Sequence, residues 1–156
     1  MMQSTLQDSI RTLIIPLQGR NLLLPNVAVA EVIPYLRPRA IDAAPEWLLG
    51  AISWRGLNIP LISYDRLQGI HNESALGQTR IAVINTVRPD GGLQFYALVT
   101  AGIPQLKRIN VESIQELSAE AGEGLLSQVQ IGDIQAFIPD LSALESVVAE
   151  CWQQVA

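Results

Sequence analysis

Short apolar segments separated by turn-forming residues run along the chain, and no other feature of the sequence restricts the fold as strongly. Residues 81–87 and 93–100 flank an Arg-Pro-Asp-Gly-Gly linker, and residues 128–131 and 134–138 flank Gly-Asp. Both linkers have the composition of tight hairpin turns. Five similar segments lie nearer the N-terminus, at 13–17, 22–24, 27–33, 51–54 and 58–63. Short strands at this spacing predict small barrels or a sandwich rather than βαβ units.

Two segments carry helical signals. Residues 45–50 begin with proline and end with glycine, which predicts a single helical turn. The C-terminal segment is longer, and Asp140 can cap it, with Ser142 and Glu145 as an alternative capping box. Its apolar residues share one helical face, which we expect to dock on the β core: Leu141, Leu144, Val148 and Cys151. Cys151 would then be a small buried residue rather than a reactive thiol.

Residues 104–127 are the least regular part of the chain. Four glutamates, at positions 112, 116, 120 and 123, fall nearly one helical turn apart. Like charges at that spacing disfavour a long isolated helix. We therefore predict a loop with short helical turns.

Charge is distributed unevenly along the 156 residues, of which 49% are apolar and 16% charged, a composition that suits one domain with a filled core. All ten basic residues lie at or before Arg108, and eight acidic residues with no basic one follow it. The net charge of −5 argues against nucleic acid as the main partner, because phosphate binding requires a concentrated basic face. The acidic part either forms a second binding surface or keeps the protein soluble.

Catalytic and cofactor motifs are missing from the sequence. Lys107 follows a leucine instead of the glycine of a phosphate-binding loop, and no dinucleotide-binding glycine pattern occurs. One histidine and one cysteine cannot form a usual zinc site. A hydrolase would have to use His71, which lies in a stretch with the composition of a surface loop. We therefore expect no enzyme activity, no metal and no cofactor.

The sequence predicts a cytoplasmic protein. No apolar run approaches the roughly 20 residues needed to cross a bilayer, so direct membrane insertion is not expected. The N-terminal residues lack the basic and apolar regions of a secretory signal. The single cysteine allows no internal disulfide and suits a reducing compartment.

Residues 50–62, which read Gly-Ala-Ile-Ser-Trp-Arg-Gly-Leu-Asn-Ile-Pro-Leu-Ile, are the most informative stretch. Two apolar strands flank Arg55 and Gly56, and Pro60 follows the glycine by four residues. Gly56 can adopt a positive φ and turn the chain sharply. Arg55 would then project from a stiff corner, with a planar head of five donors suited to carboxylates or backbone carbonyls.

This stretch resembles the signature of the CheW family of bacterial chemosensory coupling proteins, approximately G-x-x-x-x-R-G-x-x-x-P-x-x. Glu31, Val32 and Ile33 are similar to the family's acidic-aliphatic segment at the end of an early strand. Residues 38–50 resemble the connector that precedes the signature. The later strands and the C-terminal helix follow the family's order, so the likeness covers nearly the whole chain.

The resemblance implies a mainly β fold of two small, SH3-like, five-stranded β-barrels with a C-terminal helix. It places a single CheW-like domain of two sub-barrels at residues 10–153, after an N-terminal tail at residues 1–9. It also implies a non-catalytic adaptor that links the signalling tip of a methyl-accepting chemoreceptor to the regulatory domain of a CheA-type histidine kinase. One barrel face would pair with the kinase, and a groove between the barrels would take the receptor helices.

Two positions depart from the family's pattern. Ser63 stands where the family often has aspartate, and Ala101 where it often has the aspartate of an Asp-Gly pair. The loss of two acids indicates a divergent member that serves a system other than flagellar chemotaxis, such as type IV pilus motility. The alternative is an SH3-like protein-binding module of another signalling assembly, since a fold does not determine its partner.

Two charged residues, Arg55 and Glu31, are the first candidates for contacts in the expected protein-binding site. Arg55 is either an anchor at the mouth of the groove or a solvated turn residue, and Gly56 shapes its turn. Glu31 pairs with Arg55 or with an arginine of the partner, or it is an ordinary exposed strand acid.

Each apolar residue of this site belongs either to the contact surface or to the apolar core. Trp54 fits the core better than a contact surface. Leu57 and Ile59, like Ile62, line either the groove or the barrel interior, and alternation alone does not separate these readings.

Overall fold

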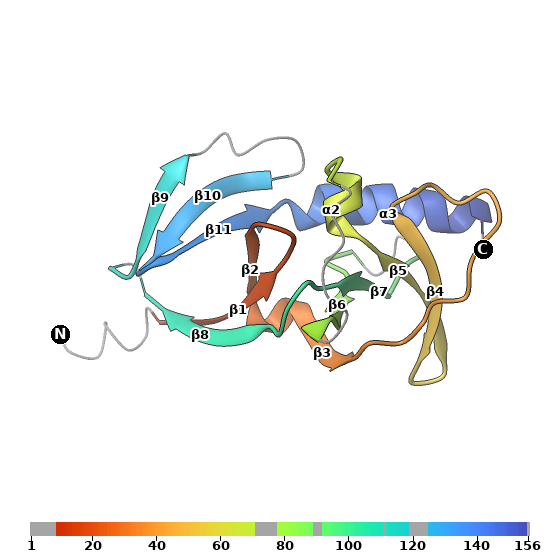
Figure 1. Cartoon of the computed structure of the whole chain (residues 1–156), viewed down its shortest axis with the longest axis horizontal. Coiled ribbons are helices and arrows are strands. Elements are labelled where there is room, and N and C mark those ends of the chain that lie inside the picture. The colour runs from red at the N-terminus through yellow and green to blue at the C-terminus, as the bar shows by residue number, and fades with distance from the viewer. Residues whose placement is uncertain (1–8, 71–77, 89–91, 111, 119–124, 156) are drawn as a thin grey trace.

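The computed structural model describes residues 9–70, 78–88, 92–110, 112–118 and 125–155. Within these ranges the chain forms two β-sheets and one long helix at the C-terminal end (Figure 1). The prediction of a mainly β fold with a C-terminal helix is therefore confirmed. His71, the candidate base, lies outside the described residues.

Sheet 1 contains six strands in the order β8-β1-β2-β11-β10-β9, one more than expected. Neighbouring strands are antiparallel except for β2 and β11, which are parallel. The strands are β1 (Ile10–Pro16), β2 (Asn21–Pro25), β8 (Gln105–Ile109), β9 (Ile114–Ser118), β10 (Leu125–Ile131) and β11 (Ile134–Pro139).

Sheet 2 contains five strands in the order β3-β6-β7-β5-β4, with β5 and β7 parallel and the other pairs antiparallel. A short 3-10 turn, η1 (Asn26–Ala28), carries the chain from sheet 1 into sheet 2, and β8 brings it back. The strands are β3 (Val29–Pro34), β4 (Leu48–Trp54), β5 (Leu57–Ile62), β6 (Arg80–Asn85) and β7 (Phe95–Val99).

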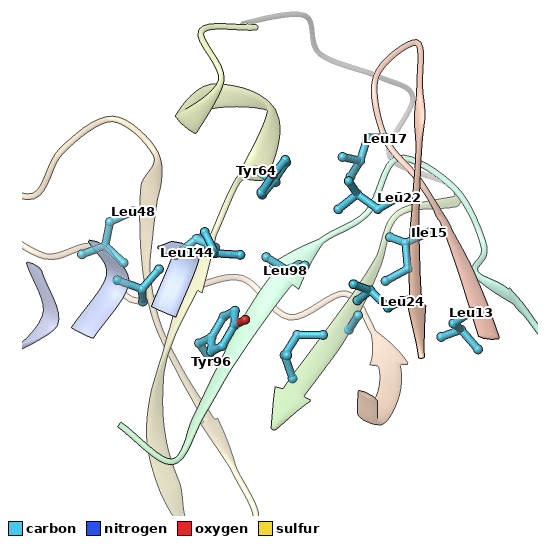
Figure 2. Close-up of a cluster of buried hydrophobic side chains, with 14 of the residues drawn as sticks. Leu13, Ile15, Leu17, Leu22, Leu24, Leu48, Tyr64, Tyr96, Leu98 and Leu144 are labelled. Carbon is cyan, nitrogen blue, oxygen red and sulfur yellow. The ribbon is translucent and has the colours of Figure 1, made fainter. Parts of the chain in front are cut away.

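A shared apolar core fills the space between the two sheets (Figure 2). Strand β1 shows how the sequence builds it, because Leu13 and Ile15 belong to this core while Ile14 belongs to a second cluster within sheet 1. A strand that is buried on both faces reads as a continuous apolar run, which explains why this segment shows no polar alternation.

The C-terminal helix α3 (Leu141–Val155) docks on the shared core through Leu144 and Val148. Asp140 caps it as predicted, since its Oδ1 atom accepts a hydrogen bond from the backbone N–H of Ala143 at 3.1 Å. Cys151 is half-buried, less covered than predicted; it packs against the same core, and burial raises the pKa of its thiol. No helix among the described residues is long and apolar enough to cross a bilayer.

The helical turn predicted at residues 45–50 is wrong. The chain makes a hydrogen-bonded turn there, and β4 begins at Leu48, which pairs with Ile62 of β5. Strand pairing and burial of Leu48 outweigh the local helical signal. A short helix, α2 (Tyr64–Leu67), forms later, where the hydroxyl of Ser63 accepts a hydrogen bond from the N–H of Arg66 at 3.2 Å.

The loop with helical turns predicted for residues 104–127 is also wrong for the residues that the structure describes there, which leave out 111 and 119–124. This region supplies β8, β9 and the start of β10. The strands form because β1 and β10 offer them hydrogen-bonding edges and because Ile109 and Ile114 pack into the cluster within sheet 1. The spacing of the glutamates does not reveal that β1 and β10 are available to pair with these segments.

Candidate protein-binding site

A two-residue turn, Arg55-Gly56, joins β4 to β5, whose terminal residues Trp54 and Leu57 pair with each other. Both turn residues have positive φ, 49° at Arg55 and 77° at Gly56. Positive φ at both central positions is typical of a type I′ hairpin turn. The expected turn at Gly56 is confirmed, and the left-handed conformation of Arg55 adds a strain that residues other than glycine, asparagine and aspartate normally avoid.

The Arg55 guanidinium lies beside the carboxylate of Glu31 on β3. Nη2 of Arg55 and Nε1 of Trp54 both donate to Oε1 of Glu31, at 3.2 Å and 3.0 Å. The guanidinium carbon also lies 4.8 Å from the centre of the Trp54 ring, which adds a cation–π contact. The Glu31–Arg55 pair expected from the sequence is therefore present.

This cluster joins the two edges of sheet 2. Strands β3 and β4 are the outermost strands of the sheet, yet Glu31 on β3 reaches Trp54 and Arg55 at the end of β4. The segment after β3 adds a bridge between Arg39 and Ala51 of β4. Sheet 2 therefore curls toward closure. We call the Arg55–Gly56 turn, held in place by these contacts, the braced corner.

The apolar residues of the predicted site separate into two groups. Trp54 and Ile59 are buried in the cluster within sheet 2, and Trp54 meets Phe95 edge-on with ring centres 4.8 Å apart. Ile62 belongs to the shared core. Leu57 is 39% exposed at the start of β5. Only Leu57 of these residues presents a largely open apolar side chain next to Arg55.

A hollow of about 360 Å³ lies beside the turn. Its apolar lining comes from β5, the segment that leads into β7, and α3: Leu57, Ile59, Leu93, Phe95 and Trp152. Asn58 and Gln94 add polar groups. Sequence reasoning did not identify Trp152 as part of this hollow, although its position one turn after Val148 extends the apolar face of α3.

The arrangement suits binding. Two thirds of the Arg55 side chain, 67%, remains exposed despite its ion pair, so the guanidinium is available to a further carboxylate or carbonyl. The neighbouring hollow can receive an apolar side chain. Among the described residues, no group of three or more His, Cys, Asp or Glu side chains could hold a metal ion.

A second charged cluster lies between the sheets and was not expected. Nε of Arg20, in the β1–β2 turn, lies 3.9 Å from Oδ1 of Asp65 in α2, and its guanidinium sits over the rings of Tyr64 and Phe137. Asp65 also accepts the backbone N–H of Gln18 at 3.0 Å. Burial raises the pKa of Asp65, while the Gln18 hydrogen bond and Arg20 oppose the rise. The side chains are mostly covered, so this cluster connects the sheets and does not form a binding surface.

Comparisons with known proteins agree with the fold. A family model described as CheW-like domain matches residues 11–148. The structure is similar to the crystal structure of the scaffolding protein TtCheW from Thermoanaerobacter tengcongensis, with a TM-score of 0.73 and 20% sequence identity over 86% of this chain and 91% of that one. At that identity the likeness concerns the fold. A search of curated proteins found no match to this sequence.

Proposed function

We propose, from the premise that this chain belongs to the family of CheW-like domains, that it is a non-catalytic adaptor coupling chemoreceptors to a CheA-type histidine kinase. The observation that carries the proposal is the Arg55 turn, which holds an exposed guanidinium on a braced corner beside an apolar hollow. An adaptor acts by positioning its partners, so interface energetics decide its activity.

The sequence predicts Arg55 at the mouth of the receptor groove between the barrels, but the hollow beside it is lined by sheet 2, the segment before β7 and α3, so we assign the kinase regulatory domain to this corner. A carboxylate or carbonyl of the partner would meet Arg55, and an apolar side chain would enter the hollow beside Leu57. A transient contact of this kind buries on the order of 1,200 Å² or less, and a few anchors dominate it. The receptor tip would use a separate surface, and both partners place the protein in the cytoplasm.

The role in a system other than flagellar chemotaxis, such as type IV pilus motility, rests on the sequence departure at Ala101, because Ser63 is buried and caps α2 as an aspartate would. Ala101 donates its N–H to the carbonyl of Pro16.

Calorimetric titration with the regulatory domain of the organism's own CheA-type kinases tests the proposal. We expect Arg55→Asn to weaken binding at least about tenfold, which corresponds to about 1.4 kcal/mol, with no loss of melting temperature because Asn-Gly suits a type I′ turn. Arg88→Asn removes an exposed arginine that bonds Ser146 of α3, and it should leave binding unchanged.

Two results would contradict this assignment. If Arg55→Asn bound as tightly as the native protein, the corner would have no part in the interface. If the native protein bound neither a chemosensory kinase nor a receptor tip, an SH3-like module of another signalling assembly would be the better description.

A further inference from the structure

Pro60 lies inside β5, a strand that has β4 on one side and β7 on the other. Proline has no backbone N–H, so in sheets it is normally confined to edge strands, bulges or the first residue of a strand. Pro60 occupies none of these places, because it is the fourth residue of β5 and stands opposite Ala51 of β4 in a regular part of the register. The interior of sheet 2 therefore has to accommodate a missing donor.

The missing donor faces β7. Successive pairs along two antiparallel strands alternate between hydrogen-bonded and non-hydrogen-bonded ones. Ala51 donates its N–H to the carbonyl of Arg39 at 2.9 Å and accepts the Arg39 N–H at 2.8 Å, so its polar groups point away from β5. The Ala51–Pro60 pair is thus a non-hydrogen-bonded one, and the polar side of Pro60 points toward β7. Asn58, two residues earlier, directs its backbone N–H and C=O the same way.

The pairing between β5 and β7 begins only after Pro60, with Leu61 opposite Ala97. One more residue of this parallel register would place Pro60 opposite Tyr96 and would require a Pro60 N–H for the carbonyl of Phe95. Pro60 cannot supply it. Strand β7 itself extends further back, since it stays paired with β6 as far as Phe95. The two strands therefore part at the proline.

The hollow beside the braced corner lies where these strands part. Its residues from β5 all precede Pro60, and its residues from the other side, 92–95, all precede the paired part of β7. The carbonyl of Gln94 accepts the N–H of Thr86 at 3.2 Å, on the β6 side, so the next residue, Phe95, directs its backbone groups toward β5. The hollow thus combines apolar side chains with the backbone groups of Asn58 and Phe95.

We propose that Pro60 is a positioning residue that keeps β5 and β7 apart, and that the opening receives a short extended segment of the partner. This inference rests on the proposed function, since it assigns the segment to the kinase regulatory domain. The backbone of the segment would hydrogen-bond to Asn58 and Phe95, as when a peptide strand is added to a sheet. One of its apolar side chains would lie against Leu57 and Trp152.

Pro60→Val tests the proposal, because valine restores the N–H and favours a strand. In hydrogen-exchange NMR of the free variant, we expect the new amide at position 60 to be protected like the amides in the middle of β6. Calorimetric titration with the kinase regulatory domain should show binding at least about tenfold weaker than that of the native protein. Pro60→Ala gives the same test with a smaller side chain if valine does not fit the buried site.

Pro34→Val is the matched control. Pro34 is exposed at the end of β3, in the same sheet but away from the hollow, so this variant should bind like the native protein. A Pro60→Val amide that exchanges freely would overturn the role of Pro60 in separating the strands. A protected amide together with native affinity would overturn the role of the opening in binding.

The proposed function and this inference fail in different ways. If Arg55→Asn weakens kinase binding and a closed Pro60→Val does not, the proposed function stands and the inference is wrong. If the native protein does not bind the kinase domain, the proposed function and the assigned occupant are both wrong. The exchange measurement needs no partner, so it decides in either case whether Pro60 keeps β5 and β7 apart.

Discussion

At Arg55, backbone strain and side-chain contacts act in opposite directions. A residue other than glycine at a φ of 49° costs about 1–2 kcal/mol of conformational free energy. Asparagine would adopt the same turn at a lower conformational cost. The ion pair with Glu31 and the contact with Trp54 offset part of that cost. An arginine kept in a strained position with most of its side chain exposed is the kind of outlier that points to a binding role.

The contribution of the Glu31–Arg55 pair to stability can be measured with a double-mutant cycle of Glu31→Gln and Arg55→Asn. Both side chains are partly exposed, 42% and 67%, so we expect a coupling energy of only about 0.2–1 kcal/mol. Glutamine keeps an oxygen for the Trp54 indole, which limits the effect of Glu31→Gln to the ion pair. Urea unfolding of the four proteins gives the value, and a coupling of zero would reject the pair as a stabilising contact.

At the scale of elements, Glu145 holds α3 to sheet 2. Its carboxylate is buried and accepts the backbone N–H groups of Val87, at 2.6 Å, and Arg88, at 3.2 Å, just beyond β6. The capping box predicted for this residue is therefore wrong, and its side chain instead satisfies two amides of another element. A glutamate three residues after Ser142 is compatible with both roles, and only the docking of α3 distinguishes them.

We expect Glu145→Ala to lower the free energy of unfolding by about 1–3 kcal/mol, because it leaves two backbone donors without their acceptor. Glu145→Gln, which retains one carbonyl oxygen, should lose less. Hydrogen exchange gives the second measurement: the Val87 and Arg88 amides should exchange faster in Glu145→Ala, while amides in the middle of β1 stay protected. Unchanged exchange at Val87 would show that other contacts hold this segment.

The elements that were predicted correctly are those whose signals are local. Gly132-Asp133 joins β10 to β11, and Asp140 begins α3, because turn and cap residues act within a few positions of the chain. Strand β9 was missed because its partner is β10, and a strand depends on an edge to pair with. The sequence likewise contained no sign that Arg20 and Asp65 lie together.

Gly50 at the start of the signature and Ser63 directly after it show the same limit. Gly50 has a φ of 146°, and a side chain there would clash with the carbonyl oxygen of Arg39, a contact that no local pattern predicts. Ser63 looked like the loss of an acid, yet its hydroxyl caps α2, a role that aspartate fills equally well. The sequence thus predicted the Arg55–Gly56 corner, while the reasons for the flanking residues lie in contacts with other strands.

At the scale of the whole molecule, the two sheets and α3 share one core. Leu22 of sheet 1, Leu98 of sheet 2 and Leu144 of α3 belong to the same apolar cluster (Figure 2). Neither sheet can separate without exposing that cluster, and fluorescence and circular dichroism should therefore report the same unfolding transition. The shared core fixes how the Arg55 corner on sheet 2 is placed relative to the edges of sheet 1.

The shared core also contains two tyrosines, which make stability fall at alkaline pH. Burial raises the pKa of Tyr64 from 10.0 to about 12, and burial raises the pKa of Tyr96 as well. The unfolded chain loses each phenolic proton near pH 10 while the folded chain keeps it. Ionisation therefore lowers the free energy of the unfolded state first and reduces the stability of the fold. For Tyr64, the stability present below pH 10 is lost as pH rises from 10.0 to about 12.

Urea unfolding at a series of pH values measures this loss. Tyr64→Phe has no phenol at that position, so its free energy of unfolding should fall less steeply than that of the native protein between pH 10.0 and about 12. Ile62→Val, a change in the same core without a titrating group, should lower the curve by about 0.5–1.5 kcal/mol and leave its slope unaltered. Equal slopes for the native protein and Tyr64→Phe would mean that Tyr64 ionises in the folded state as it does in the unfolded chain, and that the shared core around it admits water.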